Sequence, residues 1–449
     1  MATGSTTAPS VSGTILKNFP GTSKSKIIEL KGGADTPDPN GCVDGKYFHE
    51  LLNGTYTRYF KENGKVESRI TDTQFWEDAG IPASYLFDPR LLFVDGAGPS
   101  GKGILFACQL GSKQILLATS DPYGASSTWR GVTVPTADAP DLPRAAYDTK
   151  SLSVVISSGQ HYDQEIRYFP RWTLNSFPLL VGYAKTFKYA REIAGETLHP
   201  VLETTVGYPN RGYAYYVGVD TSSKIGLTYG WLEHSNLEGG LKFGKIPVGN
   251  FEYAVNRAHQ PGDQANNPSL VFGGQGIVTP PYRVGNNIWV VHHTTGQAQN
   301  VAIRWYRLEV NEGAQWPLRL AATGLIQGAS PFLYDYFNGS IIQAGGSVVL
   351  CCNRSGQLGT STNPKDPSCG NAGMYAVYLN PDSTEFEVVP IRAGLAANYK
   401  SSVKWGDYST VCLDPENPKT VWMTNQLVLK GGETPAESDY ATQIAAIQF

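Results

Sequence analysis

Seven short apolar runs recur along the whole chain, and this repetition limits the possible folds more than any other feature of the sequence. Each run follows a turn-forming cluster, and all but the first hold mainly aliphatic, β-branched or aromatic residues, which predicts a strand. The runs occupy residues 49–53, 104–108, 152–156, 225–229, 288–292, 348–352 and 421–425. Their spacing of roughly 50 to 75 residues is the interval expected when each unit is a four-stranded sheet with its loops.

Sheets that repeat in this way must protect their edge strands, and a radial arrangement does so. We therefore predict an all-β chain that forms a single β-propeller of about seven blades, with six as the alternative count. Two packed β-sandwiches are the other architecture considered, and the even recurrence along the chain argues against them. The composition agrees, since 49 Gly and 29 Pro can supply turns and 11% of the 449 residues are aromatic.

The two ends of the chain are expected to close the ring. Residues 442–449 are apolar with Gln interspersed and predict a final strand, and residues 14–30 can supply its partner in the same blade. Residues 1–13 read as a loose tail, which leaves 14–449 as one propeller domain. Only two short segments, 73–79 and 189–193, favour a helix.

Several predicted hairpins begin with an aspartate. A carboxylate at this position accepts hydrogen bonds from backbone N–H groups two residues on, so these side chains are expected to be structural. The turns concerned are Asp88-Pro89-Arg90, Tyr147-Asp148-Thr149, Val219-Asp220-Thr221 and Leu413-Asp414-Pro415.

Charge and hydropathy exclude some partners. The net charge is −3 with no basic run between aromatics, so we expect no nucleic-acid partner. No apolar stretch approaches the roughly 20 residues of a membrane span, so we expect no membrane partner. The Ser/Thr/Pro-rich start favours a mature secreted protein over the alternative, a cytoplasmic one. Sequons at Asn53, Asn338 and Asn353 permit glycosylation.

The six cysteines leave two interpretations open. In a secreted protein, Cys42 could pair with Cys108, and Cys369 with Cys351 or Cys352, which leaves the remaining one for Cys412. Alternatively, the cysteines on predicted strands are buried thiols. No Cys/His spacing favours zinc, so no metal is expected.

One block of residues carries a resemblance to a known group of proteins. Lys404-Trp405-Gly406-Asp407-Tyr408-Ser409 is followed by a Leu-Asp-Pro turn and by Trp422 on the next strand. The chain resembles secreted β-propeller proteins with a Trp-Gly-Asp-Tyr-Ser signature over roughly residues 40–449. Most of them have no assigned activity, so the resemblance implies a fold more than a function. A vaguer similarity, which no motif carries, is to fungal propeller hetero-Diels–Alderases.

Two neighbouring histidines are candidates for catalysis. His292 and His293 lie on a predicted strand, where successive side chains face opposite sides, so at most one can face a central pocket and the two cannot share a metal. A histidine there can act as a general base or a hydrogen-bond donor. The alternative is a satisfied histidine packed between blades.

The signature block and several aromatics supply the other candidates. Asp407, Tyr408 and Arg304 are candidate catalytic residues, and the alternative for the signature block is a structural corner. The candidate ligand-binding residues are aromatic or basic side chains that can stack on a ligand or bind a carboxylate. They are Lys404, Trp405, Phe332, Tyr334, Tyr336, Arg283 and Trp289.

Three classes of function remain open. The first is a cofactor-independent, monomeric enzyme that binds an apolar or aromatic small molecule and directs its reaction by shape, as in a cycloaddition, which predicts one deep apolar pocket with few carboxylates. The second is a sialidase-like glycan hydrolase or lyase, with carboxylates across an open cleft. The third is a non-catalytic glycan-binding propeller with repeated shallow sites. No cofactor motif is present, and the first class is favoured.

Overall fold

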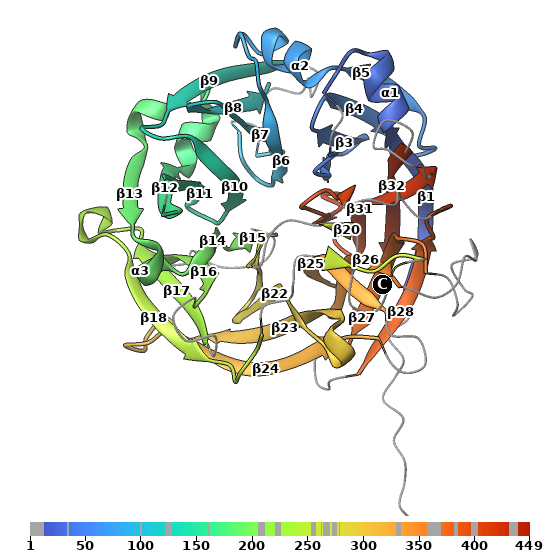
Figure 1. Cartoon of the computed structure of the whole chain (residues 1–449). Coiled ribbons are helices and arrows are strands. Elements are labelled where there is room, and N and C mark those ends of the chain that lie inside the picture. The colour runs from blue at the N-terminus through green and yellow to red at the C-terminus, as the bar shows by residue number, and fades with distance from the viewer. Residues whose placement is uncertain are drawn as a thin grey trace, which may run out of the picture.

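The computed structural model describes residues 13–449 except 34–35, 99–100, 122–127, 160, 205–211, 221–225, 253–256, 262, 264–269, 272–275, 278, 329–333, 357–369, 381–384, 397–402 and 431–438. Seven sheets, antiparallel apart from one parallel pair in blade 5, are arranged in a ring around a central axis, which confirms the predicted seven-bladed propeller (Figure 1). The predicted tail, residues 1–13, lies almost wholly outside the described residues.

The first three blades follow each other along the chain, and each runs from its innermost to its outermost strand. Blade 1 contains β2 (Asn40–Val43), β3 (Tyr47–Leu52), β4 (Thr55–Phe60) and β5 (Val66–Ile70). Blade 2 contains β6 (Phe87–Val94), β7 (Ile104–Gly111), β8 (Gln114–Ser120) and β9 (Trp129–Pro135). Blade 3 contains β10 (Pro140–Tyr147), β11 (Ser151–Ser158), β12 (Asp163–Pro170) and β13 (Lys185–Tyr189).

Blades 4 and 5 are linked by one strand. Blade 4 contains β14 (Glu196–Pro200), β16 (Tyr213–Val219), β17 (Gly226–Glu233) and β18 (Lys242–Pro247). Blade 5 contains β15 (Leu202–Glu203), β21 (Tyr282–Val284), β22 (Asn287–Thr295), β23 (Val301–Val310) and β24 (Leu318–Ile326). Because β15 pairs in parallel with β21, the chain of blade 4 adds a strand to blade 5.

The remaining blades include both ends of the chain. Blade 6 contains β25 (Asp335–Ala344), β26 (Ser347–Ser355), β27 (Gly373–Leu379) and β28 (Phe386–Arg392). Blade 7 contains β30 (Thr410–Leu413), β31 (Thr420–Lys430), β32 (Asp439–Gln448) and, outermost, β1 (Thr14–Ser23). A small sheet of β19 (Arg257–Ala258), β20 (Leu270–Val271) and β29 (Val403–Lys404) lies over the face shown in Figure 1.

Helices are short and peripheral. The α-helices are α1 (Lys24–Glu29), α2 (Asp72–Asp78) and α3 (Arg191–Ala194). The 3-10 helices are η1 (Arg171–Asn175), η2 (Val181–Tyr183), η3 (Leu237–Gly239) and η4 (Gln297–Gln299). The helix predicted at 73–79 is confirmed as α2. It begins after Thr71, because the Thr71 side chain caps the helix by accepting from the Gln74 N–H. In the segment 189–193, where a second helix was predicted, Tyr189 ends β13 and residues 191–193 belong to α3. Within the described residues, no helix is long and apolar enough to span a bilayer.

The ring closes by pairing the two ends of the chain, as predicted. β1 and β32 run antiparallel, from Thr14 opposite Gln448 to Ser23 opposite Ala441. A buried carboxylate ties this pair to blade 1: Glu50 accepts from the Thr22 N–H at 3.2 Å and from the Thr442 hydroxyl at 2.5 Å. The predicted partner segment continues to residue 30, and its last part is α1 instead of strand.

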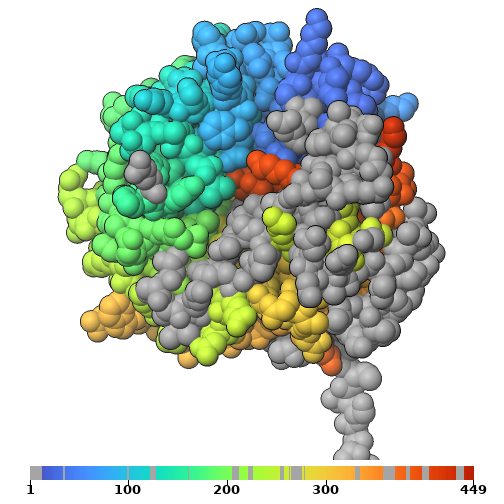
Figure 2. Space-filling view, viewed as in Figure 1, coloured from blue at the N-terminus to red at the C-terminus, as the bar shows by residue number. Residues whose placement is uncertain are grey.

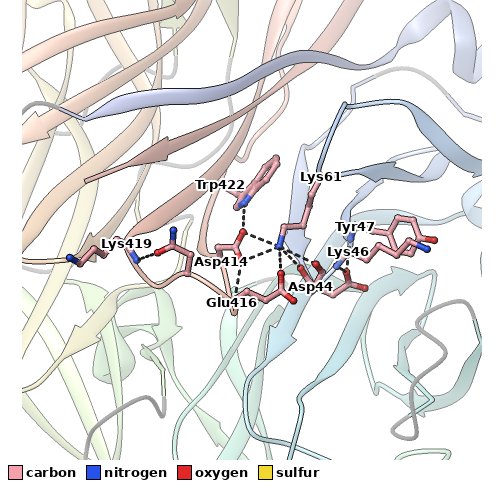
Figure 3. Close-up of polar contacts among 10 residues, drawn as sticks. Asp44, Lys46, Tyr47, Lys61, Asp414, Glu416, Lys419 and Trp422 are labelled. Carbon is pink, nitrogen blue, oxygen red and sulfur yellow. Dashed lines mark hydrogen bonds and ion pairs between the residues drawn. The ribbon is translucent and has the colours of Figure 1, made fainter.

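An ion pair fastens blade 7 to blade 1 at a second point (Figure 3). Lys61 follows β4, and its Nζ lies 2.9 Å from Asp414 Oδ2 and 3.0 Å from the Asp44 carbonyl. Asp414 also accepts from Trp422 Nε1 at 2.9 Å and, through Oδ1, from the Glu416 N–H at 3.0 Å. Since the Lys61 and Asp414 side chains are only 13% and 8% exposed, water competes weakly for this pair.

The seven apolar runs mark one strand in each blade, but not the innermost one. Five of them lie on second strands, residues 225–229 lie largely on the third strand of blade 4, and residues 288–292 lie on the third of the five strands of blade 5. The second strand has neighbours on both edges and blades on both faces, so nearly all its residues are buried, as in β7 and β11, and apolar residues predominate in β7. The innermost strands, which line the axis, are more polar and less conspicuous in sequence.

The predicted aspartate turns divide into two kinds. Asp148 and Asp414 hold hairpins between first and second strands, as predicted, by accepting from N–H groups two or three residues on. Asp220 lies in the next hairpin, between β16 and β17. The prediction for Asp88 is wrong, because Asp88 lies within β6 at the axis.

The described cysteines are free. Cys42, Cys108, Cys351 and Cys352 are buried, and Cys412 is half-buried, so no proposed disulfide between these five is present. Cys369 lies outside the described residues. Two sequon asparagines are buried as well: Asn338 Nδ2 donates to the Gly406 carbonyl, and Asn353 Nδ2 donates to the Gln426 carbonyl. A glycan on either amide would break these bonds.

Candidate functional site

Four of the innermost strands share a bulge near their first residues. Register shifts interrupt β6, β10, β14 and β25 near their first residues. At these bulges, φ is positive at Asp88 (56°), Leu142 (48°), Thr197 (50°) and Asn338 (50°), and it is 45° at Asp38, just before β2. Bulges redirect side chains and are frequent beside functional sites. Here they turn several side chains toward one end of the axis.

A polar cavity of about 540 Å³ opens at this end of the ring. It is lined by Thr36, Asp38, Asn53, Phe87, Asp88, Asp141, Leu142, Ser157, Tyr162, Gln164, Arg191, Glu196, Thr197, Lys404 and Asp407. These residues come from blades 1 to 4 and from the segment that leads into blade 7. On this face, orange-red segments near the C-terminus lie near the middle of the ring, beside blue and cyan segments (Figure 2).

Two buried carboxyls, Asp38 and Asp88, form the centre of the cavity. Asp38 accepts from the Asp407 N–H at 2.8 Å and from Asn53 Nδ2 at 2.7 Å, and Asn53 Oδ1 accepts from the Asp88 N–H at 3.0 Å. Asn53 therefore links the two aspartates. Asp88 also accepts from the Tyr408 hydroxyl at 3.1 Å.

The pKa values of both carboxyls are raised toward neutrality. Burial is the main cause for Asp38, and the nearby Asp407 charge adds to it, so its pKa rises to about 6. Burial, followed by the Asp38 charge, raises the pKa of Asp88 to about 7. Because neighbouring carboxylates resist ionising together, the pair retains a proton near neutral pH.

Basic and aromatic groups lie directly below the carboxyl pair. The Arg90 guanidinium stacks 3.4 Å from the centre of the Tyr408 ring, and both side chains are buried. Arg144, on the neighbouring blade, is 1% exposed, and burial lowers its pKa to about 9. The site thus places a proton-sharing acid pair above buried positive charge.

The structure brings part of the signature block to this site. Lys404 and Asp407 line the cavity, and Tyr408 contacts Asp88 and Arg90. Trp405 turns the other way: it is fully buried, and its Nε1 donates to Asn353 Oδ1 at 3.1 Å. Trp405 is therefore a core residue, which was the alternative considered for this block.

The two histidines lie on β22, the third of the five strands of blade 5, and line none of the cavities described here. His292 Nε2 is 2.7 Å from the Tyr306 hydroxyl and Nδ1 is 2.7 Å from the His293 carbonyl, while burial lowers the pKa of His292 to about 3. His293 Nε2 accepts from the Asn338 N–H at 2.8 Å. Both imidazoles thus have structural partners, the alternative stated above.

The other predicted site residues are dispersed. Arg304 Nη2 donates to the Val248 carbonyl at 2.6 Å and borders a separate cavity of about 520 Å³. Arg283 Nη2 pairs with Glu312 at 3.0 Å, and Trp289 Nε1 donates to Gln343 at 2.9 Å. Tyr334 and Tyr336 are buried between blades 5 and 6. Phe332 lies outside the described residues.

The central acids were missed as site residues, although a sequence pattern marks them. Asp38-Pro39-Asn40, Asp88-Pro89-Arg90 and Leu142-Pro143-Arg144 place X-Pro-Asn/Arg at three successive blade entrances. Proline lacks an N–H, so within a sheet it is confined to strand starts, edges and bulges. The repetition of this tripeptide could have identified the innermost strands and the acids before them.

A second cavity lies along the axis toward the opposite end. Its volume is about 150 Å³, and the inner strands line it with mainly apolar groups such as Leu92, Ile341, Ile342 and Val411. Arg90 borders it as well. Among the described residues, no group of three or more His, Cys, Asp or Glu side chains is placed to hold a metal ion.

No protein-family model matches the chain, and no curated protein matches its sequence. Solved structures share its propeller architecture at low similarity. An α-L-arabinofuranosidase mutant from Fusarium graminearum, bound to an iminosugar inhibitor, is 10% identical with a TM-score of 0.42 over 95% of this chain and 97% of that one. The Dos1 propeller is 9% identical with a TM-score of 0.41 over 91% and 77% of the two chains.

Proposed function

We propose that the polar axial cavity is an active site in which Asp38 and Asp88 perform acid–base catalysis on a hydroxyl-rich ligand, a glycan, by hydrolysis or β-elimination. The observation that carries the proposal is the pair of adjacent buried carboxyls with pKa values of about 6 and 7. A carboxyl with a pKa near neutrality can both deliver and accept a proton at the working pH.

The surrounding groups suit this role. Asp88 supplies the proton to the leaving oxygen. The Tyr408 hydroxyl orients the Asp88 carboxyl by a hydrogen bond, and Asn53 holds the Asp88 backbone by accepting from its N–H. Lys404 and Asp407 line the same cavity and can bind ligand hydroxyls. A volume of about 540 Å³ falls within the range of small-molecule sites. The polar lining, with five carboxylates including Asp141 and Glu196, favours a glycan over an apolar substrate.

The test is to assay Asp88→Asn and Asp38→Asn on neutral and acidic polysaccharides. New reducing ends report either reaction, and ultraviolet absorbance of an unsaturated product reports elimination only. We expect Asp88→Asn to lose a factor of about 10² to 10⁴ in rate. For the wild type, activity should fall as the pH rises through about 7, where Asp88 loses its proton. The matched control is Asp78→Asn, because Asp78 is an exposed residue at the end of α2. Equal activity in Asp88→Asn and the control would refute the proposal.

A second candidate function rests on the apolar axial cavity. It supports the binding of an apolar small molecule, the class in which a cycloaddition enzyme falls. A cavity of about 150 Å³ holds a group of about benzene size. We rank this function second because that volume is small for a polyene. Ile342→Phe should fill the cavity and abolish binding of benzene as a probe, and unchanged binding would contradict this candidate.

A further inference from the structure

Three basic side chains form the layer directly below the polar cavity. Asp88, Leu142 and Thr197 line the cavity, and Arg90, Arg144 and His199 follow each of them two residues later on the innermost strands of blades 2, 3 and 4. The three basic residues are 3%, 1% and 0% exposed. The three therefore lie between the polar cavity, which none of them lines, and the apolar axial cavity, which Arg90 borders.

The hydrogen-bonding capacity of the two arginines is largely unused. Arg90 Nη1 donates to the Pro89 carbonyl at 3.0 Å, and Arg144 Nη2 donates to Ser157 Oγ at 2.9 Å. Arg90 Nη2 and both Nε and Nη1 of Arg144 are buried without a hydrogen-bond partner. Among the described residues, neither guanidinium has a carboxylate within ion-pair distance. Buried donors without partners are costly, so three donors here point to a missing acceptor.

His199 complements the arginines with an acceptor. Its Nδ1 lies 3.0 Å from the Pro200 carbonyl, which can only accept, so Nδ1 carries the proton. In the neutral ring, Nε2 then presents a lone pair, and this atom too is buried without a partner. Burial, with the charges of Arg144 and Arg90, holds the pKa of His199 well below its usual value, so the ring stays neutral.

We propose that Arg90, Arg144 and His199 bind a hydroxycarboxylate, the carboxylate end of an acidic sugar. The carboxylate accepts from the guanidinium donors, which match its planar geometry, and a neighbouring hydroxyl donates to His199 Nε2. One negative charge also offsets part of the buried positive charge. The inference rests on the proposed glycan chemistry, since it names the substrate class of the same site.

The experiment compares three six-membered-ring ligands by calorimetric titration of the full chain. Glucuronate carries both a carboxylate and hydroxyls, cyclohexanecarboxylate carries only the carboxylate, and glucose carries only hydroxyls. We expect glucuronate to bind at least tenfold more tightly than either of the other two. Equal binding of glucuronate and glucose, or displacement of glucuronate by sodium chloride alone, would overturn the proposal.

Variants locate the binding. Arg144→Met should weaken glucuronate binding at least tenfold, and His199→Phe should remove the preference for glucuronate over cyclohexanecarboxylate. Arg304→Met is the matched control, because Arg304 lies at another cavity and bonds only to carbonyls and Thr323. Replacing a buried arginine without an ion pair by an apolar residue of similar size is not expected to unfold the chain. Near-UV circular dichroism checks this.

The outcome separates the two proposals. If Asp88→Asn binds glucuronate normally but loses turnover, both proposals stand. If Arg144→Met loses binding while Asp88→Asn remains fully active, the arginine site stands and the acid–base role fails. If Arg144→Met binds glucuronate like the wild type, the arginine site fails whatever happens to catalysis.

Discussion

Replacing Lys61 by Met should weaken the joint between blades 7 and 1 (Figure 3). The substitution keeps the length of the side chain but removes the partner of Asp414, which is 8% exposed. Removing one member of a buried ion pair typically costs about 3 to 5 kcal/mol. Asp414 keeps its bonds from Trp422 Nε1 and the Glu416 N–H, and Lys61 is itself 13% exposed. We therefore expect about 2 to 3 kcal/mol of lost stability.

The assay is urea unfolding followed by tryptophan fluorescence, with a double-mutant cycle to isolate the pair. Lys61→Met, Asp414→Asn and the double variant should give a coupling energy of about 1 to 2 kcal/mol. Lys26→Met is the matched control, because its pair with Glu29 is exposed (51% and 61%) and should contribute less than about 0.5 kcal/mol. A loss in Lys61→Met no larger than in this control, or strict additivity in the cycle, would refute the reasoning.

Three further predictions concern buried ionisable groups. The pKa of Asp88 in the folded protein (about 7) exceeds its usual 3.8, so its contribution to stability is full below about pH 4 and is lost as the pH rises to about 7. The urea midpoint of the wild type should therefore fall over this pH range, and Asp88→Asn should reduce the fall by about half. An equal pH dependence of the midpoint in the variant and the wild type would contradict the raised pKa. Burial likewise raises the pKa of Glu50, so Glu50→Gln should reduce the pH dependence of the free energy of unfolding above about pH 4.5. Glu50→Ala should cost about 2 kcal/mol, because it leaves the Thr442 and Tyr59 hydroxyls without their acceptor. Alkylation of the unfolded, unreduced protein should label Cys42, Cys108, Cys351, Cys352 and Cys412, and mass spectrometry that finds any two of them bonded would contradict the free thiols.

The sequence by itself determined the architecture, because the strongest patterns come from strands that are buried on both faces. The runs at 104–108 and 152–156 are fully buried and mostly apolar for that reason, and the recurrence of such runs predicted seven blades. The strand at the C-terminus was equally visible, and its pairing with β1 followed from the need to close a ring.

The site was decided by the tertiary structure. Asp38, Asp88, Asp407 and Arg144 lie far apart in the chain and meet only because four blades direct their first strands to one axis. The sequence placed Lys404, Asp407 and Tyr408 in one candidate block but could not show that Trp405, in the same block, faces the core.

His292 and His293 illustrate the same limit. Their adjacency predicted that they face opposite sides of a strand, and this holds. However, the strand is the third of five in its blade and does not line the axis, so both rings have hydrogen-bond partners between blades. Local sequence fixes the direction of a side chain relative to its own strand. Its distance from the axis depends on which neighbour each strand pairs with, and long-range contacts alone decide that.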